Sequence, residues 1–120
     1  MRKLELYEGF QKRSPLSAEF KAHYGNKIDK LLIFEDPISV EFNNVVINKE
    51  YRNKGITTDI LNNVTEYADK ENKIVTLTPA ADYGSNLKRL KKFYQRFGFV
   101  FNYGKNKSFK FRDSMIRYPR

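Results

Sequence analysis

YRNKGITTDIL, residues 51–61, is the stretch that decides how this chain folds. Basic residues and one glycine, Gly55, stand directly before a segment with helical periodicity. The first turn of a helix leaves unpaired backbone N–H groups that favour an anion, and glycine lets that anion approach without meeting a Cβ. A plain helix start capped by Thr57 or Thr58 fits the same residues. The stretch therefore predicts a helix start that either holds a phosphate or is only capped.

Strand and helix patterns alternate on both sides of this stretch. The strands that we predict cover residues 4–7, 30–34, 38–47, 74–78, 99–103 and 108–111, the last of which could extend beyond residue 111. The helices that we predict cover residues 15–24, 56–70 and 87–97. Asn43 and Asn44 interrupt the strand at residues 38–47 and predict a β-bulge there. This order predicts one domain over residues 1–120, of the α/β (α+β) class, with a mixed, mostly antiparallel sheet flanked by helices.

Individual residues predict where several of these elements begin and end. We expect Ser17 to cap the first helix and Gly98 to end the last one. Asp36 and the proline after it are typical of a turn, and we interpret Glu35 as a turn residue as well. The apolar face of the last helix comprises Leu87, Leu90, Tyr94 and Phe97.

Composition limits the chemistry that the chain can carry. It has 120 residues, 40% of them hydrophobic, and no cysteine, which excludes disulfides, thiolate zinc sites and cysteine nucleophiles. The single histidine, His23, argues against a Ser-His-Asp triad and a multi-histidine metal site, so we expect no metal. The chain lacks the roughly 18 consecutive apolar residues of a membrane span, and its N-terminus lacks the apolar core of a signal peptide. We expect a cytoplasmic protein without a membrane partner.

The net charge of +9 is concentrated near the C-terminus. Residues 87–120 hold 11 of the 23 Lys and Arg but only one of the 14 Asp and Glu, so this part of the chain carries +10. Such asymmetry favours a polyanionic partner, which is nucleic acid, a phosphorylated cofactor or an acidic surface. A solvated, solubilising face is the alternative.

Two motifs resemble the hallmarks of the GNAT superfamily of N-acetyltransferases. Residues 52–57 (RNKGIT) are similar to the Gln/Arg-x-x-Gly-x-Gly/Ala signature, which binds the coenzyme A pyrophosphate. Residues 93–99 (FYQRFGF) are similar to a helix that carries a tyrosine and ends at Gly-Phe. The resemblance covers residues 38–118. It implies a compact GNAT acyl-CoA N-acyltransferase fold with a shortened N-terminal region, and transfer of acetyl from acetyl-CoA to a primary amine by direct attack.

The resemblance also implies site residues. Tyr94 matches the family tyrosine that hydrogen-bonds or protonates the coenzyme sulfur, and packing in the core is the alternative for this side chain. Glu41 matches the catalytic glutamate of some members, whereas others use no dedicated base. A backbone N–H around Val45 to Ile47, in our interpretation that of Val46, would polarise the thioester carbonyl. The residues implied to contact the coenzyme are Val45, Val46, Ile47, Arg52, Asn53, Lys54, Gly55, Ile56, Thr57, Asn86, Arg89 and Tyr94.

Two positions depart from the family pattern. Thr57 stands where the family has glycine or alanine. Its hydroxyl could cap the helix or contact phosphate, and its bulk could weaken phosphate binding instead. Leu87 stands where the family often has an asparagine, so the implied contact of Asn86 is displaced by one residue. The basic face of the last helix, which includes Arg89, could serve the adenosine 3′-phosphate or an acidic acceptor.

Other functions fit parts of the chain. A nucleic-acid-binding module would use basic residues interleaved with aromatic ones to contact phosphates and stack bases. A GNAT domain could instead acetylate a lysine of a nucleic-acid-associated protein, or bind coenzyme A without activity. The acceptor implied by the resemblance is a small amine, a protein lysine or an N-terminus, and homodimers are common in the family.

Overall fold

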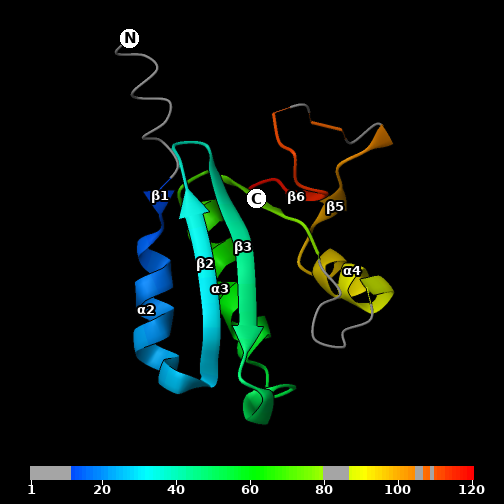
Figure 1. Cartoon of the computed structure of the whole chain (residues 1–120). Coiled ribbons are helices and arrows are strands. Elements are labelled where there is room, and N and C mark those ends of the chain that lie inside the picture. Colours follow the sequence, from blue (N-terminus) through cyan, green and yellow to red (C-terminus); the bar gives the residue numbers. More distant parts are fainter. Residues whose placement is uncertain (1–11, 80–86, 105–106, 109) are drawn as a thin grey trace.

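The computed structural model describes residues 12–79, 87–104, 107–108 and 110–120 (Figure 1). The predicted strand at residues 4–7 lies outside this part of the chain. The described strands are β1 (Lys12–Arg13), β2 (Ile28–Glu35), β3 (Ser39–Ile47), β4 (Ile74–Leu77), β5 (Val100–Phe101) and β6 (Met115–Arg117). The described helices are α2 (Pro15–Tyr24), α3 (Ile56–Lys70) and α4 (Leu87–Gln95), with short 3₁₀ turns η1 (Gly25–Lys27) and η2 (Lys49–Tyr51).

The described strands form one mixed sheet in the order β1-β2-β3-β4-β6-β5. Neighbours are antiparallel except β3 and β4, which are parallel and joined by the crossover helix α3. Figure 1 shows α3 behind β2 and β3, and α2 beside β2. Phe20 of α2 and Ile60 of α3 belong to one buried apolar cluster, so both helices cover the same face. The predicted class and the mixed, mostly antiparallel sheet are confirmed.

The N-cap of helix α2 lies three residues earlier than we expected. Ser14 is the N-cap, and its hydroxyl accepts a hydrogen bond of 3.2 Å from the Leu16 N–H. Pro15 explains the difference, because proline favours the first helical position and so puts the cap before it. The prediction that Ser17 caps the helix is wrong. Ser17 is buried, and its hydroxyl bonds both the N–H and the carbonyl of Ile33 in β2.

Helix α3 covers the predicted residues 56–70. Its buried residues recur at helical spacing and pack against the sheet, and each such apolar side chain contributes roughly 1.5–3 kcal/mol on burial. They are Ile56, Ile60, Leu61, Val64, Thr65 and Ala68. The packing of this apolar face on the sheet therefore holds the helix and its first turn in place.

Glu35 is a buried residue at the end of β2, so its interpretation as a turn residue is wrong. It accepts hydrogen bonds from Ser14 Oγ (2.6 Å), Tyr67 Oη (2.9 Å) and Lys73 Nζ (2.9 Å). Burial alone raises the pKa of Glu35, but these bonds from Ser14, Lys73 and Tyr67 lower it below its ordinary value. This carboxylate ties the start of α2, the body of α3 and the approach to β4 together.

The hairpin of β2 and β3 has the predicted turn and the predicted bulge. Asp36 Oδ1 accepts hydrogen bonds from the N–H groups of Ile38 (2.9 Å) and Ser39 (2.7 Å). Leu32 pairs with Asn44 and Ile33 pairs with Phe42, so Asn43 is the extra residue of a β-bulge. The interruption at the two asparagines is confirmed.

The last third of the chain differs from the prediction at three points. Helix α4 ends at Gln95, and Gly98 follows with a φ of 97° in the turn after it. Leu87, predicted on the apolar face, is 39% exposed. The second strand of the hairpin is β6, not residues 108–111, because the buried run that fits between β4 and β5 is Met115–Arg117.

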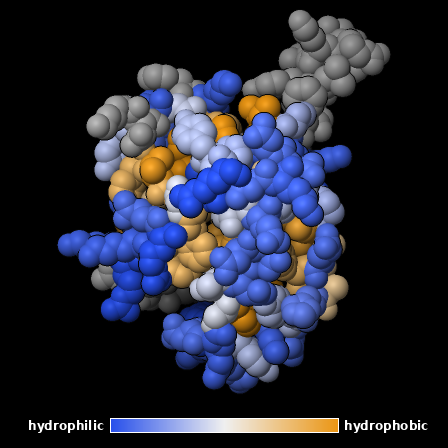
Figure 2. Space-filling view, turned by 180° about the vertical axis from the view of Figure 1, so that it is seen from behind, coloured by the Kyte–Doolittle hydropathy of each residue, from blue (hydrophilic) through white to orange (hydrophobic). Residues whose placement is uncertain are grey.

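Figure 2 shows the face that carries α3, where hydrophilic residues cover most of the surface and apolar patches lie between them. In the described part of the chain, no helix is both long and apolar enough to cross a membrane.

Candidate functional site

The loop between β3 and α3 is held by its own polar groups. The side chain of Asn48 accepts a hydrogen bond of 3.0 Å from the Glu50 N–H, and its carbonyl accepts one of 2.8 Å from Tyr51. These bonds form the short turn η2. Arg52 Nε donates to the carbonyl of Ile47 over 3.0 Å, which folds the loop back onto the end of β3.

The loop then passes through two left-handed residues before the helix. Asn53 has a φ of 61° and Gly55 a φ of 83°. Asn53, Lys54 and Gly55 are exposed. A Cβ added at Gly55 would meet no atom within 4 Å, so it would project into open space beside the helix start. The glycine is therefore required by the backbone and keeps the approach to the helix open.

Helix α3 starts without a side-chain cap. Gly55 is the N-cap residue and has no side chain to accept a hydrogen bond from the first turn. The alternative in which Thr57 or Thr58 caps the helix is wrong, because the left-handed Gly55 is the N-cap residue. The N–H groups of the first turn and the positive end of the helix dipole remain available to an anion. Thr57 is partly buried and Thr58 is exposed.

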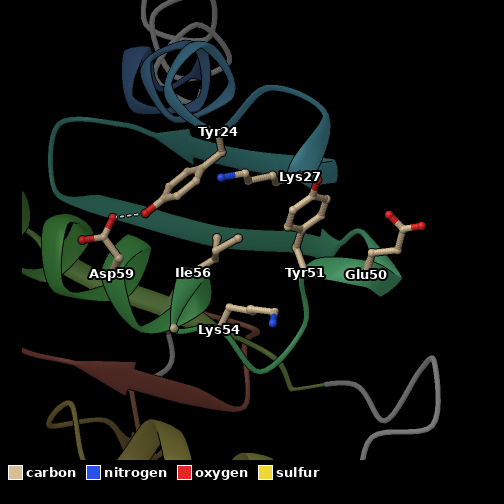
Figure 3. A pocket seen from close by; sticks show the side chains of 8 residues that line it. Tyr24, Lys27, Glu50, Tyr51, Lys54, Ile56 and Asp59 are labelled. Carbon is tan, nitrogen blue, oxygen red and sulfur yellow. Dashed lines mark hydrogen bonds between the residues drawn. The ribbon is translucent and has the colours of Figure 1, made fainter.

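A pocket opens at this helix start and extends toward the end of α2 (Figure 3). Its volume is about 670 Å³, within the range of about 300–1,000 Å³ that is usual for small-molecule sites. The residues that line it are Tyr24, Lys27, Glu50, Tyr51, Lys54, Gly55, Ile56 and Asp59. The site thus joins the loop, which includes η2, to residues from α2 and η1, which are distant from it in the sequence.

Two contacts shape the walls of this pocket. The Tyr24 hydroxyl donates a hydrogen bond to the Asp59 carboxylate, which links the end of α2 to the first turn of α3. Partial burial and this bond raise the pKa of Tyr24 to about 12. On the other wall, Lys27 Nζ lies 5.4 Å from the centre of the Tyr51 ring, a cation–π distance.

One edge of β3 loses its partner strand beside this loop. β3 pairs with β4 only from Ser39 to Glu41, opposite Ile74 to Thr76. In the described residues, the six positions 42–47 have no partner on the β4 side, and we call this segment the free edge of β3. Val45, Val46 and Ile47 lie on it, Val45 partly buried and the other two buried. The bulge at Asn43 lies where the divergence begins.

Glu41 is the last β3 residue paired with β4. It is partly buried and accepts a hydrogen bond of 2.7 Å from Asn43 Nδ2, so the bulge residue orients its carboxylate. Its neighbour across β2 is Phe34. Glu41 therefore lies at the point where β3 and β4 separate.

Tyr94 lies on α4 and packs against the core. Its ring contacts those of Phe93 and Phe99 edge-on, with centroid separations of 5.4 Å and 6.0 Å. Burial raises the pKa of Tyr94, so its hydroxyl stays protonated at neutral pH. Within the described residues this hydroxyl forms no hydrogen bond. A chemical role for the hydroxyl is compatible with this packing, because the contacts with Phe93 and Phe99 involve only the ring.

One further predicted contact, Arg89, stands apart from the pocket. Arg89 is exposed on α4 and does not line it. Asn86 lies outside the described residues. The sequence indicated no role for Tyr24, Lys27, Tyr51 and Asp59, because only the packing of α2 against α3 brings these side chains together. Among the described residues, no three His, Asp or Glu side chains group so that they could hold a metal ion.

The chain is similar to known proteins over most of its length. A family model described as an acetyltransferase (GNAT) domain matches residues 20–101. Among solved structures, the chain is similar to the crystal structure of Ard1 from Thermoplasma volcanium, with 14% identity and a TM-score of 0.48. That similarity covers 86% of this chain and 77% of the other. No curated protein matches.

Proposed function

Because the chain belongs to the GNAT acetyltransferase family, we propose that it transfers acetyl from acetyl-CoA to a primary amine by direct attack. The observation that carries the proposal is the early end of the β3–β4 pairing beside an uncapped helix start. The unpaired edge of β3 is followed along the chain by the anion-binding start of α3. This order suits an acyl donor that has an amide-bearing arm and a diphosphate. We propose that this activity belongs to a single domain formed by residues 1–120.

The free edge of β3 would bind the pantetheine arm as an added strand binds a sheet. N–H groups alternate in direction along an antiparallel strand, and the Asn48 N–H points to Lys27 beside β2. By this alternation, the N–H of Val46 also points to β2, whereas those of Val45 and Ile47 point to the free edge. We therefore propose Val45 or Ile47, rather than Val46, as the donor to the thioester carbonyl.

The loop would bind the diphosphate through the N–H groups of Gly55, Ile56 and Thr57, with Lys54 adding charge. Hydrogen bonds to charged groups are worth about 1.5–3 kcal/mol each, so a few of them suffice for firm binding. Arg52 bonds the carbonyl of Ile47, which supports a role in ordering the loop and the end of β3. Asn53 contributes its left-handed turn.

Chemistry would follow at the point where β3 and β4 separate. The neutral amine attacks the thioester carbon, its proton passes to Glu41 or to water, and the departing thiolate takes a proton from Tyr94. The raised pKa of Tyr94 keeps a proton available for that step at neutral pH. Glu41, oriented by Asn43, is the candidate base.

Calorimetric titration with acetyl-CoA, followed by thiol release with panels of small amines, lysine peptides and free peptide N-termini, tests the proposal. We expect one binding site per chain and thiol release with one class of amine. Coenzyme binding without thiol release from any class would support an inactive coenzyme-binding domain instead. Absence of binding would overturn the proposal. It would favour the alternative in which the basic residues 87–120 bind nucleic acid.

A further inference from the structure

The pocket at the start of α3 extends beyond the loop that would bind a diphosphate. Tyr24 at the end of α2 and Lys27 in η1 line it as well. Figure 3 shows Lys27 pointing into the space between Tyr24 and Tyr51, with Lys54 on the other side of Ile56. Side chains from α2, η1, η2 and the loop therefore converge on one cavity of about 670 Å³.

The two lysines keep their positive charge available in this pocket. Neither Lys27 nor Lys54 forms a salt bridge with any described residue. The Asp59 carboxylate is bonded by the Tyr24 hydroxyl, and Figure 3 shows the Glu50 carboxylate turned away from both lysines. Two ammonium groups in a pocket lined by Tyr24 and Tyr51, one of them beside the Tyr51 ring, suit a ligand that combines an anion with a flat ring.

The coenzyme has such a group directly after its diphosphate. In coenzyme A, one ribose carries the diphosphate at its 5′ position, a phosphate at its 3′ position and adenine. The pocket shares Lys54, Gly55 and Ile56 with the diphosphate loop, so a ribose leaving the loop on this side enters it. The 3′-phosphate carries a charge of about −2 at neutral pH.

We propose that Lys27 binds the 3′-phosphate of the coenzyme, with the Tyr51 ring holding the lysine in position, and that this contact selects 3′-phosphorylated coenzyme. The inference rests on the proposed acetyl-CoA-dependent function. It assigns the phosphate to the α2 side of the loop and not to the basic face of α4. Lys88 and Lys92 on α4 are exposed and do not line the pocket.

Titration of variants with acetyl-CoA and with 3′-dephospho-acetyl-CoA tests the assignment. We expect the unaltered protein to bind the 3′-phosphorylated form about tenfold more tightly. Lys27→Met should bind both forms with the lower affinity, because it removes only the 3′-phosphate contact. Lys54→Met should weaken both forms, because Lys54 also borders the diphosphate loop.

The controls are Lys21→Met, which removes one charge on the exposed surface of α2, and the pair Lys88→Met and Lys92→Met on α4. All of these should keep the tenfold preference. An unaltered protein that binds both forms equally, or a Lys27→Met variant that keeps the preference, would overturn the inference while leaving the proposed function intact. Loss of the preference in the α4 variants would also overturn it. Binding of neither form would contradict the proposed function itself.

Discussion

At the scale of single residues, Gly55 has two roles: it adopts a left-handed backbone conformation, and it leaves open space beside the start of α3. Its φ of 83° lies in the left-handed region, which costs an L-residue about 1–2 kcal/mol and glycine almost nothing. The space where its Cβ would stand is open. The effect of a substitution on the free energy of unfolding and its effect on ligand binding can therefore be measured separately at this position.

Gly55→Ala should lower the free energy of unfolding by about 1 kcal/mol and weaken acetyl-CoA binding about tenfold, because the methyl group would occupy the approach to the helix start. Urea unfolding and calorimetry measure the two effects. Gly104→Ala is a matched control, since Gly104 has a φ of 64° and equally open space. It should show the same destabilisation with unchanged binding. Equal affinities of the two variants would contradict the role of Gly55.

Tyr94→Phe should lower kcat about 100-fold while changing the affinity for acetyl-CoA and the stability little. The phenol is the proposed proton donor, and the ring that packs on Phe93 and Phe99 is retained. Steady-state kinetics with a thiol-release assay measure this split. Tyr103→Phe, at a ring that is 65% exposed, serves as the control. Unchanged turnover in Tyr94→Phe would limit Tyr94 to core packing.

At the scale of elements, hydrogen bonds from polar side chains fix the positions of helices on the sheet more specifically than apolar packing alone would. Ser17 bonds the backbone of Ile33, and Glu35 connects Ser14, Tyr67 and Lys73. Together these bonds attach α2 and α3 to β2. They bear on the pocket because Tyr24 of α2 and Ile56 and Asp59 of α3 line it.

Stability should fall in acid, in part through Glu35. Its folded pKa lies below the ordinary value, so its contribution is complete above about pH 4.3 and is lost as the pH falls through the folded pKa. Glu35→Gln should lower the free energy of unfolding at pH 7 by about 2 kcal/mol and flatten its dependence on pH below 4.3. Urea unfolding between pH 3 and pH 7 measures both effects.

Glu71→Gln is the matched control for this experiment, because it removes the same charge from an exposed position. Its effect at pH 7 should stay within about 0.5 kcal/mol. If the stability of Glu35→Gln falls with pH in the same way as that of the unaltered protein, the lowered pKa of Glu35 does not contribute to stability.

The sequence predicted some of these elements to the residue and missed others for a common reason. Helix α3 was predicted correctly because its apolar stripe and the glycine before it are local signals. Residues 108–111 alternate like a strand, but the strand that forms is β6, because it pairs with both β4 and β5. Such pairing depends on long-range contacts that a local pattern does not reveal. The loop at Gly55 was predicted as a candidate anion site in the same way, whereas Lys27 joins the pocket only through tertiary packing.

At the scale of the whole molecule, one arginine joins three parts of the fold. Arg117 in β6 is 5% exposed. Its Nε donates to the Phe97 carbonyl over 2.7 Å, and its terminal nitrogens bond Asp69 of α3 at 2.8 Å and 3.1 Å. Gly98 leaves room for this contact, since a Cβ there would lie 3.2 Å from the Arg117 Nε. The turn after α4, helix α3 and the sheet are thereby fixed together.

Asp69→Ala should lower the free energy of unfolding by about 3 kcal/mol, because it leaves the buried guanidinium of Arg117 without its partner. Denaturant unfolding measures this loss. Glu66→Ala removes an exposed carboxylate from the same helix and should change stability by less than about 0.5 kcal/mol. Similar stabilities of the two variants would contradict a connecting role for the Arg117 contact.

The free edge of β3 also bears on how the protein behaves in concentrated solution. An unpaired strand edge is a template on which a strand of another chain can add. The six positions 42–47 present such an edge over the described residues, and the bulge at Asn43 twists only one end of it. The acyl donor proposed for this edge would compete with self-association, so handling the protein with coenzyme should slow its precipitation.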